Sequence, residues 1–247
     1  MGISVSMITY NEELKLEKTL KSIYKWVDEI IIVDSYSTDR TIEIAKKYGA
    51  KVYNEEWKGF GKQKNSALEK CTQDWILLID ADEEVTSELS KEILEEVKNP
   101  RGKVYEIPRL SYCFGEKTRH LDFTIRLVKA KIGSYNHKKV HENFESEENK
   151  YKLKNKINHH TYANLKEYLE KFNRYTTLAA NQMYEKGTKV NIFILIMNPM
   201  YKFLKKYFLK LAFLDGKNGL VLSVLSSYYN FIKYAKLWEL RENENKK

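Results

Sequence analysis

Hydrophobic positions in the first hundred residues fall into two alternating kinds of block. Short runs rich in Ile, Val and Leu have the length and composition of strands. Between them, apolar residues recur every three or four positions, as on one face of a helix. The expected strands are residues 3–9, 29–33, 51–53 and 75–79, and the expected helices are about 12–26, 38–48, 61–71 and 88–98. This alternation predicts an α/β fold with a mostly parallel sheet and right-handed crossovers.

The pattern changes after these elements. Residues 103–129 contain further β-rich runs, and a polar, histidine-rich segment follows. All five histidines of the chain lie between His120 and His160. From about residue 164 the apolar residues follow helical spacing. We therefore expect two parts, an α/β domain over residues 1–160 and a helical region over residues 161–247.

Polar residues follow three of the expected strands. They are Thr9-Tyr10-Asn11-Glu12 after the first strand, Asp34-Ser35 after the second and Asp80-Ala81-Asp82 after the fourth. The carboxyl ends of parallel strands meet at one edge of a sheet, and ligands of such folds bind at that edge. We expect these three segments to converge there.

The third segment is strongly acidic. Four carboxylates, Asp80, Asp82, Glu83 and Glu84, stand within five positions after an apolar run. Carboxylates repel one another and resist desolvation, so such a group requires solvent, bases or a cation. Two acids one residue apart point the same way from an extended chain and can share a divalent ion, which makes Asp82 the candidate metal ligand. The alternative is an acidic helix start, since carboxylates favour helix N-termini.

No glycine-rich phosphate loop accompanies these strands. The sequence has no Gly-x-Gly-x-x-Gly after a strand and no Walker-type Gly-x-x-x-x-Gly-Lys-Ser/Thr. A nucleotide diphosphate at this edge would therefore be neutralised by a metal and by basic side chains. Lys62 and Lys64 are the candidate cations, although a solvated helix face also explains them.

The histidine-rich segment offers two kinds of site. His137 and His141 stand four positions apart and could bind zinc, but the order His-Glu-x-x-His is absent. We favour a loop that covers the strand-end crevice and supplies a general base. Glu142 is the candidate base, because a carboxylate can accept a proton from a positioned hydroxyl. An ordinary loop acid is the alternative.

Charge is distributed unevenly along the chain. The net charge is +9, yet residues 1–150 carry 25 basic and 27 acidic side chains, whereas residues 151–247 carry 18 basic and 7 acidic ones. This asymmetry favours an anionic partner for the carboxyl-terminal part, such as a membrane surface, an acidic glycan or nucleic acid. Two cysteines form no disulfide framework, and the amino end has no basic-then-apolar pattern, so we expect a reducing compartment and no secretory signal.

Residues 192–211 combine apolar and basic positions. The apolar run at 192–197 is shorter than the roughly 18 residues that a spanning helix requires. Lys202, Lys206 and Lys210 share one helical face, and Leu, Phe and Leu at 204, 208 and 211 share another. This pattern predicts a helix in a membrane interface with its lysines toward anionic head groups, followed by a second apolar stretch at 220–240. The alternative is that both helices pack on the domain. We expect no nucleic-acid partner, since no recognised nucleic-acid-binding fold accompanies the basic residues.

Three motifs together resemble the family 2 glycosyltransferases with the GT-A fold: SVSMITYNE at 4–12, IIVDSYSTDRT at 31–41 and LIDADE at 78–83. Further motifs are similar to the bacterial lipopolysaccharide core β-1,4-glucosyltransferase subfamily. They are WKGFGKQKN at 57–65, KVHE at 139–142, FLDGK at 213–217 and YAKLW at 234–238. The resemblance covers nearly the whole chain.

The resemblance implies an inverting transfer of a sugar from a nucleotide-diphosphate donor, and UDP is the nucleotide we expect. By position in the family motifs, the resemblance implies that the base and ribose are surrounded by Thr9, Tyr10, Glu12 and Asp34. It also implies that Asp80 contacts the ribose. The sequence departs from the family pattern after Asp34, where many members carry paired acids and a glycine and this chain carries Ser and Tyr.

The resemblance also implies a Mg²⁺ or Mn²⁺ ion that Asp82 holds at the diphosphate. Arg126 and Lys64 are the candidate phosphate contacts, and Glu142 is the candidate base, so Glu142 and Asp82 are the expected catalytic residues. We expect a cytoplasmic enzyme that is peripherally attached to the inner membrane. It should transfer a hexose, with glucose as the favoured sugar, to a lipid-linked lipopolysaccharide inner-core acceptor. A protein or other glycan acceptor, or a non-catalytic sugar-nucleotide-binding protein, is the alternative.

Overall fold

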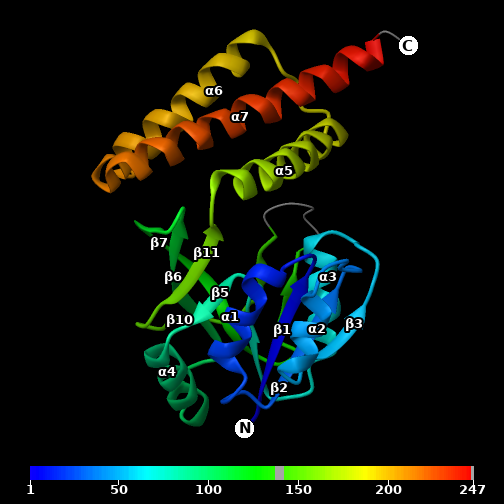
Figure 1. Cartoon of the computed structure of the whole chain (residues 1–247), viewed down its shortest axis with the longest axis vertical. Coiled ribbons are helices and arrows are strands. Elements are labelled where there is room, and N and C mark those ends of the chain that lie inside the picture. The colour runs from blue at the N-terminus through cyan, green and yellow to red at the C-terminus, as the bar shows by residue number, and fades with distance from the viewer. Residues whose placement is uncertain (137–141, 246–247) are drawn as a thin grey trace. The chain divides into compact units, whose positions relative to one another are not determined.

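The computed structural model describes residues 1–136 and 142–245. The chain divides into two compact units, each described here by itself. The first contains Met1–Ser111 and Leu121–Thr161, and the second contains Tyr112–His120 and the chain from Tyr162 onward. Figure 1 shows the strands and helices of the first unit in blue to green and the long helices of the second in yellow to red.

The first unit is built from alternating strands and helices followed by further strands. The elements are β1 (Ile3–Thr9), α1 (Glu13–Ile23), β2 (Glu29–Asp34), α2 (Thr41–Lys47), β3 (Lys51–Asn54), α3 (Phe60–Glu69), β4 (Trp75–Leu78), β5 (Glu83–Val85), α4 (Ser87–Lys98), β6 (Val104–Cys113), β7 (Glu116–Lys129), β8 (Ser134–Tyr135), β9 (Phe144–Glu145), β10 (Lys150–Lys152) and β11 (Ile157–Tyr162). The tip of the β6–β7 hairpin and the last residue of β11 belong to the second unit.

The central sheet has the order β3-β2-β1-β4-β7-β6-β11-β5 within the described residues, with β10 beside β6. Strands β3, β2, β1 and β4 are parallel, whereas β7 runs antiparallel to β4 and β5 runs antiparallel to β11. The two short strands β8 and β9 pair separately. The predicted α/β fold with a mostly parallel sheet is therefore confirmed.

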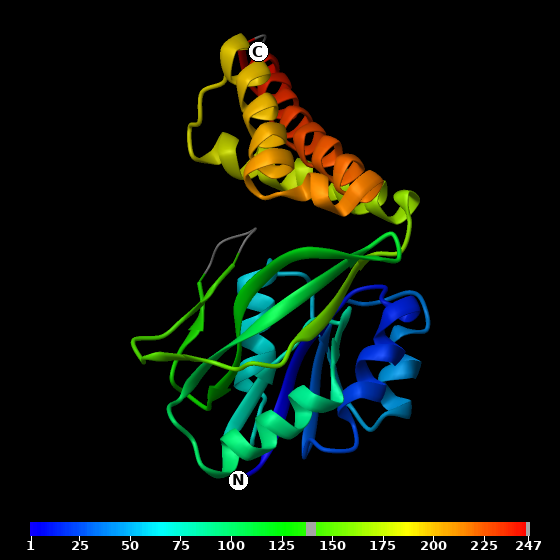
Figure 2. The ribbon, with the colours of Figure 1, turned by 90° about the vertical axis from the view of Figure 1, so that its left-hand side faces the viewer.

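Alternate residues of β4 enter different cores on the two faces of the sheet. Trp75 and Leu77 pack with apolar residues of α1 and α4, and Ile76 and Leu78 pack beside Leu68 and the β8–β9 pair. Figure 2 shows α1 and α2 on one side of the strands and α3 on the other. Because side chains alternate along a strand, a strand covered on both faces must be apolar throughout, as β4 is.

Local signals explain where the helices begin. The Thr86 hydroxyl accepts a hydrogen bond from the Leu89 N–H and caps α4, which begins at Ser87, one residue before the expected start. From there Leu89, Ile93 and Val97 recur every four residues and bury one side of α4.

The second unit is helical, as expected. It contains α5 (Leu165–Glu185), α6 (Ile192–Leu204), a π-helical turn η1 (Lys205–Leu209), a 3₁₀ turn η2 (Ala212–Asp215) and α7 (Gly216–Asn245). Asn164 and Asn191 cap α5 and α6 through their side-chain oxygens. The Phe172 ring stacks on Tyr228, with 5.2 Å between the ring centroids, which joins α5 to α7.

One expectation for the second unit needs correction. Lys206 does not extend toward solvent with Lys202 and Lys210, because its ammonium donates to the Leu222 carbonyl at 3.1 Å. Burial lowers the pKa of Lys206, as expected for an amine held away from water. Among the described residues, no helix has both the length and the apolar character needed to cross a bilayer.

Candidate functional site

The first two strand ends are joined through Asp34. The register of β1 and β2 places Thr9 opposite Asp34, and the Thr9 hydroxyl donates to the Asp34 carboxylate at 2.7 Å. The Ser37 N–H and hydroxyl donate to the same carboxylate at 2.7 and 2.6 Å. Asp34 is fully buried, so in this structure its side chain shapes the turn after β2. The predicted contact of Asp34 with a base or ribose stays a prediction.

The loops after β1 and β2 also hold each other. Asn11 lies in the left-handed region at φ +54° and its side-chain oxygen accepts a hydrogen bond from the Thr38 N–H at 2.8 Å. Tyr36 has φ +60° and so adopts the backbone conformation that favours glycine. The Glu12 N–H donates to the Thr41 hydroxyl at 2.8 Å, while the Tyr10 ring remains 46% exposed. Thr9, Tyr10, Glu12 and Asp34 thus lie together at this edge, as predicted.

The third strand end lies at the same edge. The Ile79 N–H continues the pairing of β4 with β1 by donating to the Ser6 carbonyl at 3.2 Å. Directly after it, the Thr19 hydroxyl of α1 donates to the Ala81 carbonyl at 2.8 Å. This bond fixes the turn between Asp80 and Asp82.

A chain of ion pairs surrounds Asp80. One guanidinium nitrogen of Arg126 donates to Asp80 at 2.7 Å and also contacts Glu83. The Lys64 ammonium lies 2.9 Å from the other Asp80 oxygen and 2.8 Å from Glu142. The structure therefore brings together four candidate site residues from four different parts of the sequence: Lys64, Asp80, Arg126 and Glu142.

Neighbouring charges shift the pKa values of Asp80 and Lys64. Burial raises the pKa of Asp80, but Arg126 and Lys64 outweigh burial and hold that pKa well below its usual range. Burial lowers the pKa of Lys64, yet the neighbouring charges of Asp80 and Glu142 leave it above its ordinary value. Lys64 and Arg126 are engaged with protein carboxylates, so a phosphate reaching them would share these cations with Asp80 and Glu142.

Asp82 has a different neighbour. Its Oδ1 atom lies 3.4 Å from Nε2 of His159, and its carbonyl accepts a hydrogen bond from the His160 N–H at 2.8 Å. Nδ1 of His159 lies 3.2 Å from the Thr161 hydroxyl, which orients the ring. The antiparallel pairing of β11 with β5 brings His159 to this position.

The donor set of Asp82 and His159 suits a divalent cation that keeps positions open. Among the described residues, no group of three or more His, Cys, Asp or Glu side chains could hold a metal by itself. Mg²⁺ and Mn²⁺ bind commonly through one or two protein ligands together with substrate phosphates. A carboxylate oxygen and an imidazole nitrogen that meet at a strand end fit such a site.

The remaining acids of the segment have other partners. Glu84 lies 3.1 Å from the Lys18 ammonium and 3.0 Å from Nε2 of His160. Glu83 is fully buried, contacts Arg126 and lies 3.6 Å from Arg109. Residues 83–85 form strand β5, and α4 begins only at Ser87, so the interpretation of the acids as a helix start is wrong.

A family model decides the class of protein. The model described as "Glycosyl transferase family 2" matches residues 4–193, which include all of these strand ends. The chain belongs to glycosyl transferase family 2. The acids after β4 and the loops after β1 and β2 are therefore the strand-end groups of a glycosyltransferase, and the resemblance seen in the sequence is confirmed.

Relatives of known name extend this finding over the whole chain. An uncharacterized glycosyltransferase of Rickettsia typhi is 34% identical over 96% of this chain and 87% of its own length. The lipopolysaccharide core biosynthesis glycosyltransferase LpsC of Rhizobium meliloti is 31% identical over 97% of this chain and 93% of its own. The structure of S. aureus TarS residues 1–349 in complex with UDP aligns with a TM-score of 0.50 and 16% identity, over 98% of this chain and 92% of that one, and shares the fold.

His159 is a candidate site residue that the sequence did not reveal, because its contact with Asp82 appears only in the structure. Residues 157–162 lie in the polar, histidine-rich part of the sequence, and four of the six side chains of β11 are polar. A strand assignment for Ile157–Tyr162 would have indicated His159, because a strand paired with β5 runs beside the acids at 82–84. The zinc alternative at His137 and His141 lies outside the described residues.

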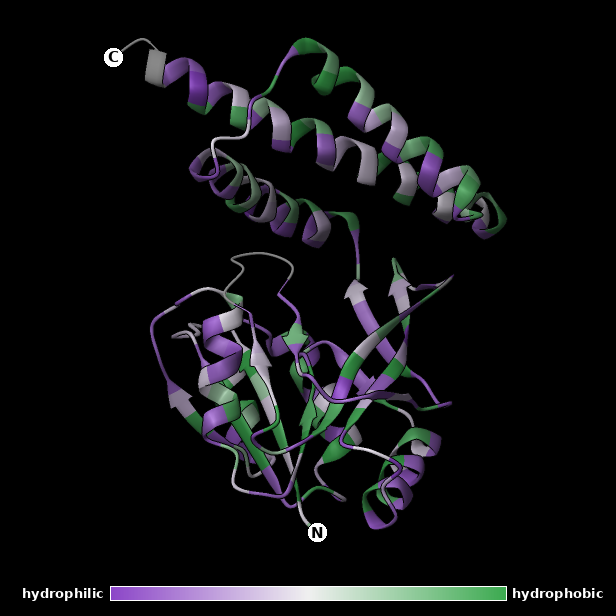
Figure 3. Ribbon diagram, turned by 180° about the vertical axis from the view of Figure 1, so that it is seen from behind, coloured by the Kyte–Doolittle hydropathy of each residue, from purple (hydrophilic) through white to green (hydrophobic). Residues whose placement is uncertain are grey.

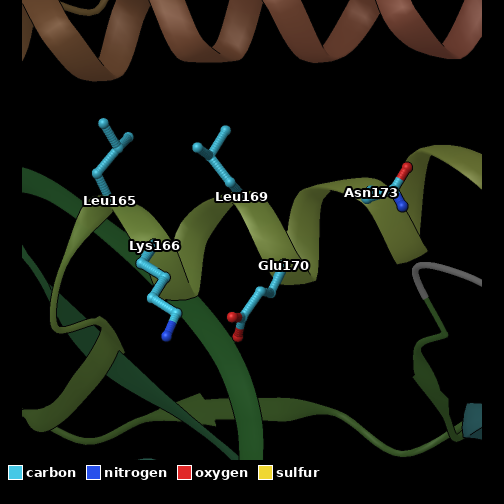
Figure 4. A pocket seen from close by; sticks show the side chains of 5 residues that line it. All are labelled: Leu165, Lys166, Leu169, Glu170 and Asn173. Atoms are coloured by element: carbon cyan, nitrogen blue, oxygen red, sulfur yellow. The ribbon is translucent and has the colours of Figure 1, made fainter.

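A pocket elsewhere in the glycosyltransferase has a different character. Figure 4 shows that Leu165 and Leu169 leave α5 on one side and Lys166 and Glu170 on the other, and Asn173 completes the lining. All lining residues come from this one helix, and none is a strand-end acid. A hollow along a single helix does not enclose a nucleotide, so the strand ends remain the candidate active site.

Proposed function

We propose that this glycosyltransferase moves a hexose, glucose in the first instance, from a UDP-sugar to a lipopolysaccharide inner-core acceptor, with inversion at the anomeric carbon and a Mg²⁺ or Mn²⁺ ion. The observation that carries the proposal is the meeting of Asp82, His159, Asp80, Lys64 and Glu142 at the carboxyl ends of the parallel strands. The core-biosynthesis relative LpsC, matched over nearly the full length of both chains, supports the class of acceptor.

The donor would bind across the loops after β1, β2 and β4. Tyr10 offers a half-exposed ring on which a base can stack, and Thr9, Glu12 and Asp34 shape the loops beside it. Asp80 would accept a hydrogen bond from a ribose hydroxyl through the part of its carboxylate that remains exposed, 28% of the side chain. TarS was solved with UDP, which makes UDP the first probe to use.

Asp82 and His159 would hold the cation at the diphosphate. A divalent cation bound there would supply positive charge against the leaving diphosphate. Lys64 and Arg126 would add further positive charge from the side of Asp80, at distances of 2.9 and 2.7 Å from that carboxylate. Stabilising charge where it develops is the largest contribution that such a site makes to the rate.

Glu142 would act as the general base. The acceptor oxygen forms a bond to the anomeric carbon on the face opposite the diphosphate, and its proton passes to the Glu142 carboxylate. The bond between the anomeric carbon and the diphosphate oxygen breaks, and the electron pair leaves with the nucleotide. Lys64, 2.8 Å from Glu142, would hold this carboxylate beside the bound donor.

The acceptor is proposed from charge and from relatives. The carboxyl-terminal part carries 18 basic and 7 acidic residues, which complements the phosphates and acidic sugars of an inner core. We place the enzyme at the cytoplasmic face of the inner membrane, with residues 161–247 as the acceptor- and membrane-associated region. A protein side chain or another surface glycan is the alternative acceptor.

Transfer from labelled UDP-sugars to a truncated core acceptor tests the proposal. We expect transfer from UDP-glucose with Mn²⁺, loss of transfer with excess chelator, and recovery when the metal is restored. Transfer to a peptide or to another glycan in the same screen would replace the acceptor. Donor binding without transfer to any acceptor, unaffected by metal, would contradict the proposed reaction.

A further inference from the structure

Helix α6 and turn η1 expose apolar side chains that nothing in the described chain covers. Pro199 is the one buried residue of α6, and η1 has none. Ile192 is 73% exposed, Phe193 66% and Leu209 74%. Helix α4, of similar length, shows the ordinary pattern, because it buries Leu89, Ile93 and Val97. Figure 3, coloured by hydropathy, shows hydrophobic residues recurring along α6.

Four of the exposed residues of α6 form one stripe. Phe193, Ile196, Met200 and Leu204 follow one another at spacings of three, four and four, so they share one side of the helix. The opposite side contacts α7, where the Ser227 hydroxyl donates to the Pro199 carbonyl at 2.8 Å. The stripe therefore faces away from the partner helix of α6.

The charges beside the stripe have a single sign. Residues 192–214 contain four lysines and no acidic residue. Lys202, Lys205 and Lys210 are exposed. The Lys206 ammonium donates to the Leu222 carbonyl, and the Lys205 ammonium lies 5.7 Å from the centroid of the Tyr201 ring. Tyr201, 59% exposed, adds an aromatic side chain of the type enriched where membrane meets water.

We propose that the stripe Phe193–Ile196–Met200–Leu204, with Lys202, Lys205 and Lys210, is the surface by which this protein binds the interface of an anionic lipid bilayer. An interfacial helix buries its apolar side at the boundary of head groups and acyl chains and keeps basic residues near anionic head groups. This inference rests on the membrane location given in the proposed function, and it names the surface that binds the membrane.

Charge favours a bilayer over a second copy of the chain. In a two-fold symmetric dimer the same surface meets itself, so the lysines of both copies would face one another with no acid on the stripe to pair with them. An anionic bilayer offers apolar chains to the stripe and negative head groups to the lysines. An anionic bilayer thus accounts for both the apolar stripe and the lysines beside it.

Co-flotation of the full-length protein with lipid vesicles tests this surface without donor or acceptor. We expect binding to vesicles of phosphatidylglycerol and phosphatidylethanolamine, and binding at least about tenfold weaker to phosphatidylcholine vesicles. The double variant Phe193→Ser, Ile196→Ser should weaken binding to anionic vesicles by at least about tenfold. Each of Lys202→Gln and Lys205→Gln should weaken it about fivefold.

Leu14→Ser is the matched control, because Leu14 is 89% exposed but lies on α1. It should bind vesicles as the unsubstituted protein does. Equal binding by the double variant and the control would overturn the proposal, as would a protein that stays in solution with anionic vesicles. A dimer in sedimentation that the double variant dissociates, without vesicle binding, would assign the stripe to a second copy instead. Metal-dependent UDP binding is measured separately, so failure of the stripe and failure of the proposed reaction are distinguishable.

Discussion

The two ends of the parallel strands both carry carboxylates, but their surroundings differ. At the amino end of β2, Glu29 accepts hydrogen bonds from the Ser4 hydroxyl at 2.5 Å, the Lys51 ammonium at 2.8 Å and the Thr72 N–H at 2.9 Å. At the carboxyl ends, Asp80 shares Arg126 with Glu83 and shares Lys64 with Glu142. Glu29 has several donors of its own, whereas Asp80 shares each of its two cations with another acid.

The difference separates stability from chemistry. A buried carboxylate whose oxygens are all matched by donors is held in one ionised state and contributes to folding. Acids that compete for donors leave negative charge available for a cation, a hydroxyl or a proton. We therefore expect substitution of Glu29 to change the free energy of unfolding. Substitution of Asp82 or Glu142 should instead change the activity.

Asp82→Asn should have the largest effect. Loss of the carboxylate charge that faces His159 should lower kcat/KM about a thousandfold, equivalent to about 4 kcal/mol. The free energy of unfolding should change by less than about 1 kcal/mol, because Asp82 is not in the apolar core. Initial rates with UDP-glucose and urea unfolding measure the two quantities. Glu88→Gln, an exposed acid on α4, is the control, and equal losses in both variants would remove Asp82 from the site.

Glu142→Gln should lower kcat by a few hundredfold, because the amide cannot accept the acceptor proton. Donor binding should change little, which titration calorimetry with UDP and Mn²⁺ would show. Glu145→Gln, three residues further along and exposed, should keep full activity. Normal turnover by Glu142→Gln would require a different base.

Glu29→Gln should affect folding and leave the reaction unchanged. Burial raises the pKa of Glu29, but the bonds from Lys51, Ser4 and Thr72 outweigh burial and lower the pKa to about 2. Against the ordinary value of 4.5, this lowering corresponds to about 3 kcal/mol of stability at neutral pH.

Because the folded-state pKa is lowered, that stability is complete above pH 4.5 and is lost as the pH falls toward 2. Urea unfolding of both proteins at several pH values should therefore show a gap at pH 7 that closes under acid conditions. A large loss of kcat/KM in the folded variant would break the comparison between the two strand ends.

His159→Gln should have the smallest effect of the four. Removing one of two protein donors should raise the Mn²⁺ concentration for half-maximal activity about tenfold and restore most of the rate at high metal. His160→Gln alters the neighbouring ring, which contacts Glu84 at 3.0 Å, and should leave the metal requirement unchanged. The same metal requirement in both variants would show that His159 is not a ligand.

The sequence predicted those parts of the fold whose hydrophobic periodicity is strong. Strands β1 to β4 and their helices follow apolar patterns, and the acids at 80–84 stand out because a buried strand precedes them. Strands β5 and β11 carry acids and histidines that pair with each other, so they resemble loops until both partners are seen together. His159 was missed for this reason. The partner of Lys206 was likewise hidden, since the Leu222 carbonyl reaches it only through tertiary packing.

A crystal of the protein soaked with UDP and Mn²⁺ gives the most direct test of the strand-end site. Anomalous scattering should locate manganese in contact with both the Asp82 carboxylate and the His159 imidazole, with the diphosphate on its open side and the uracil near Tyr10. Manganese or nucleotide bound away from these three residues would contradict the assignment of the strand ends as the active site.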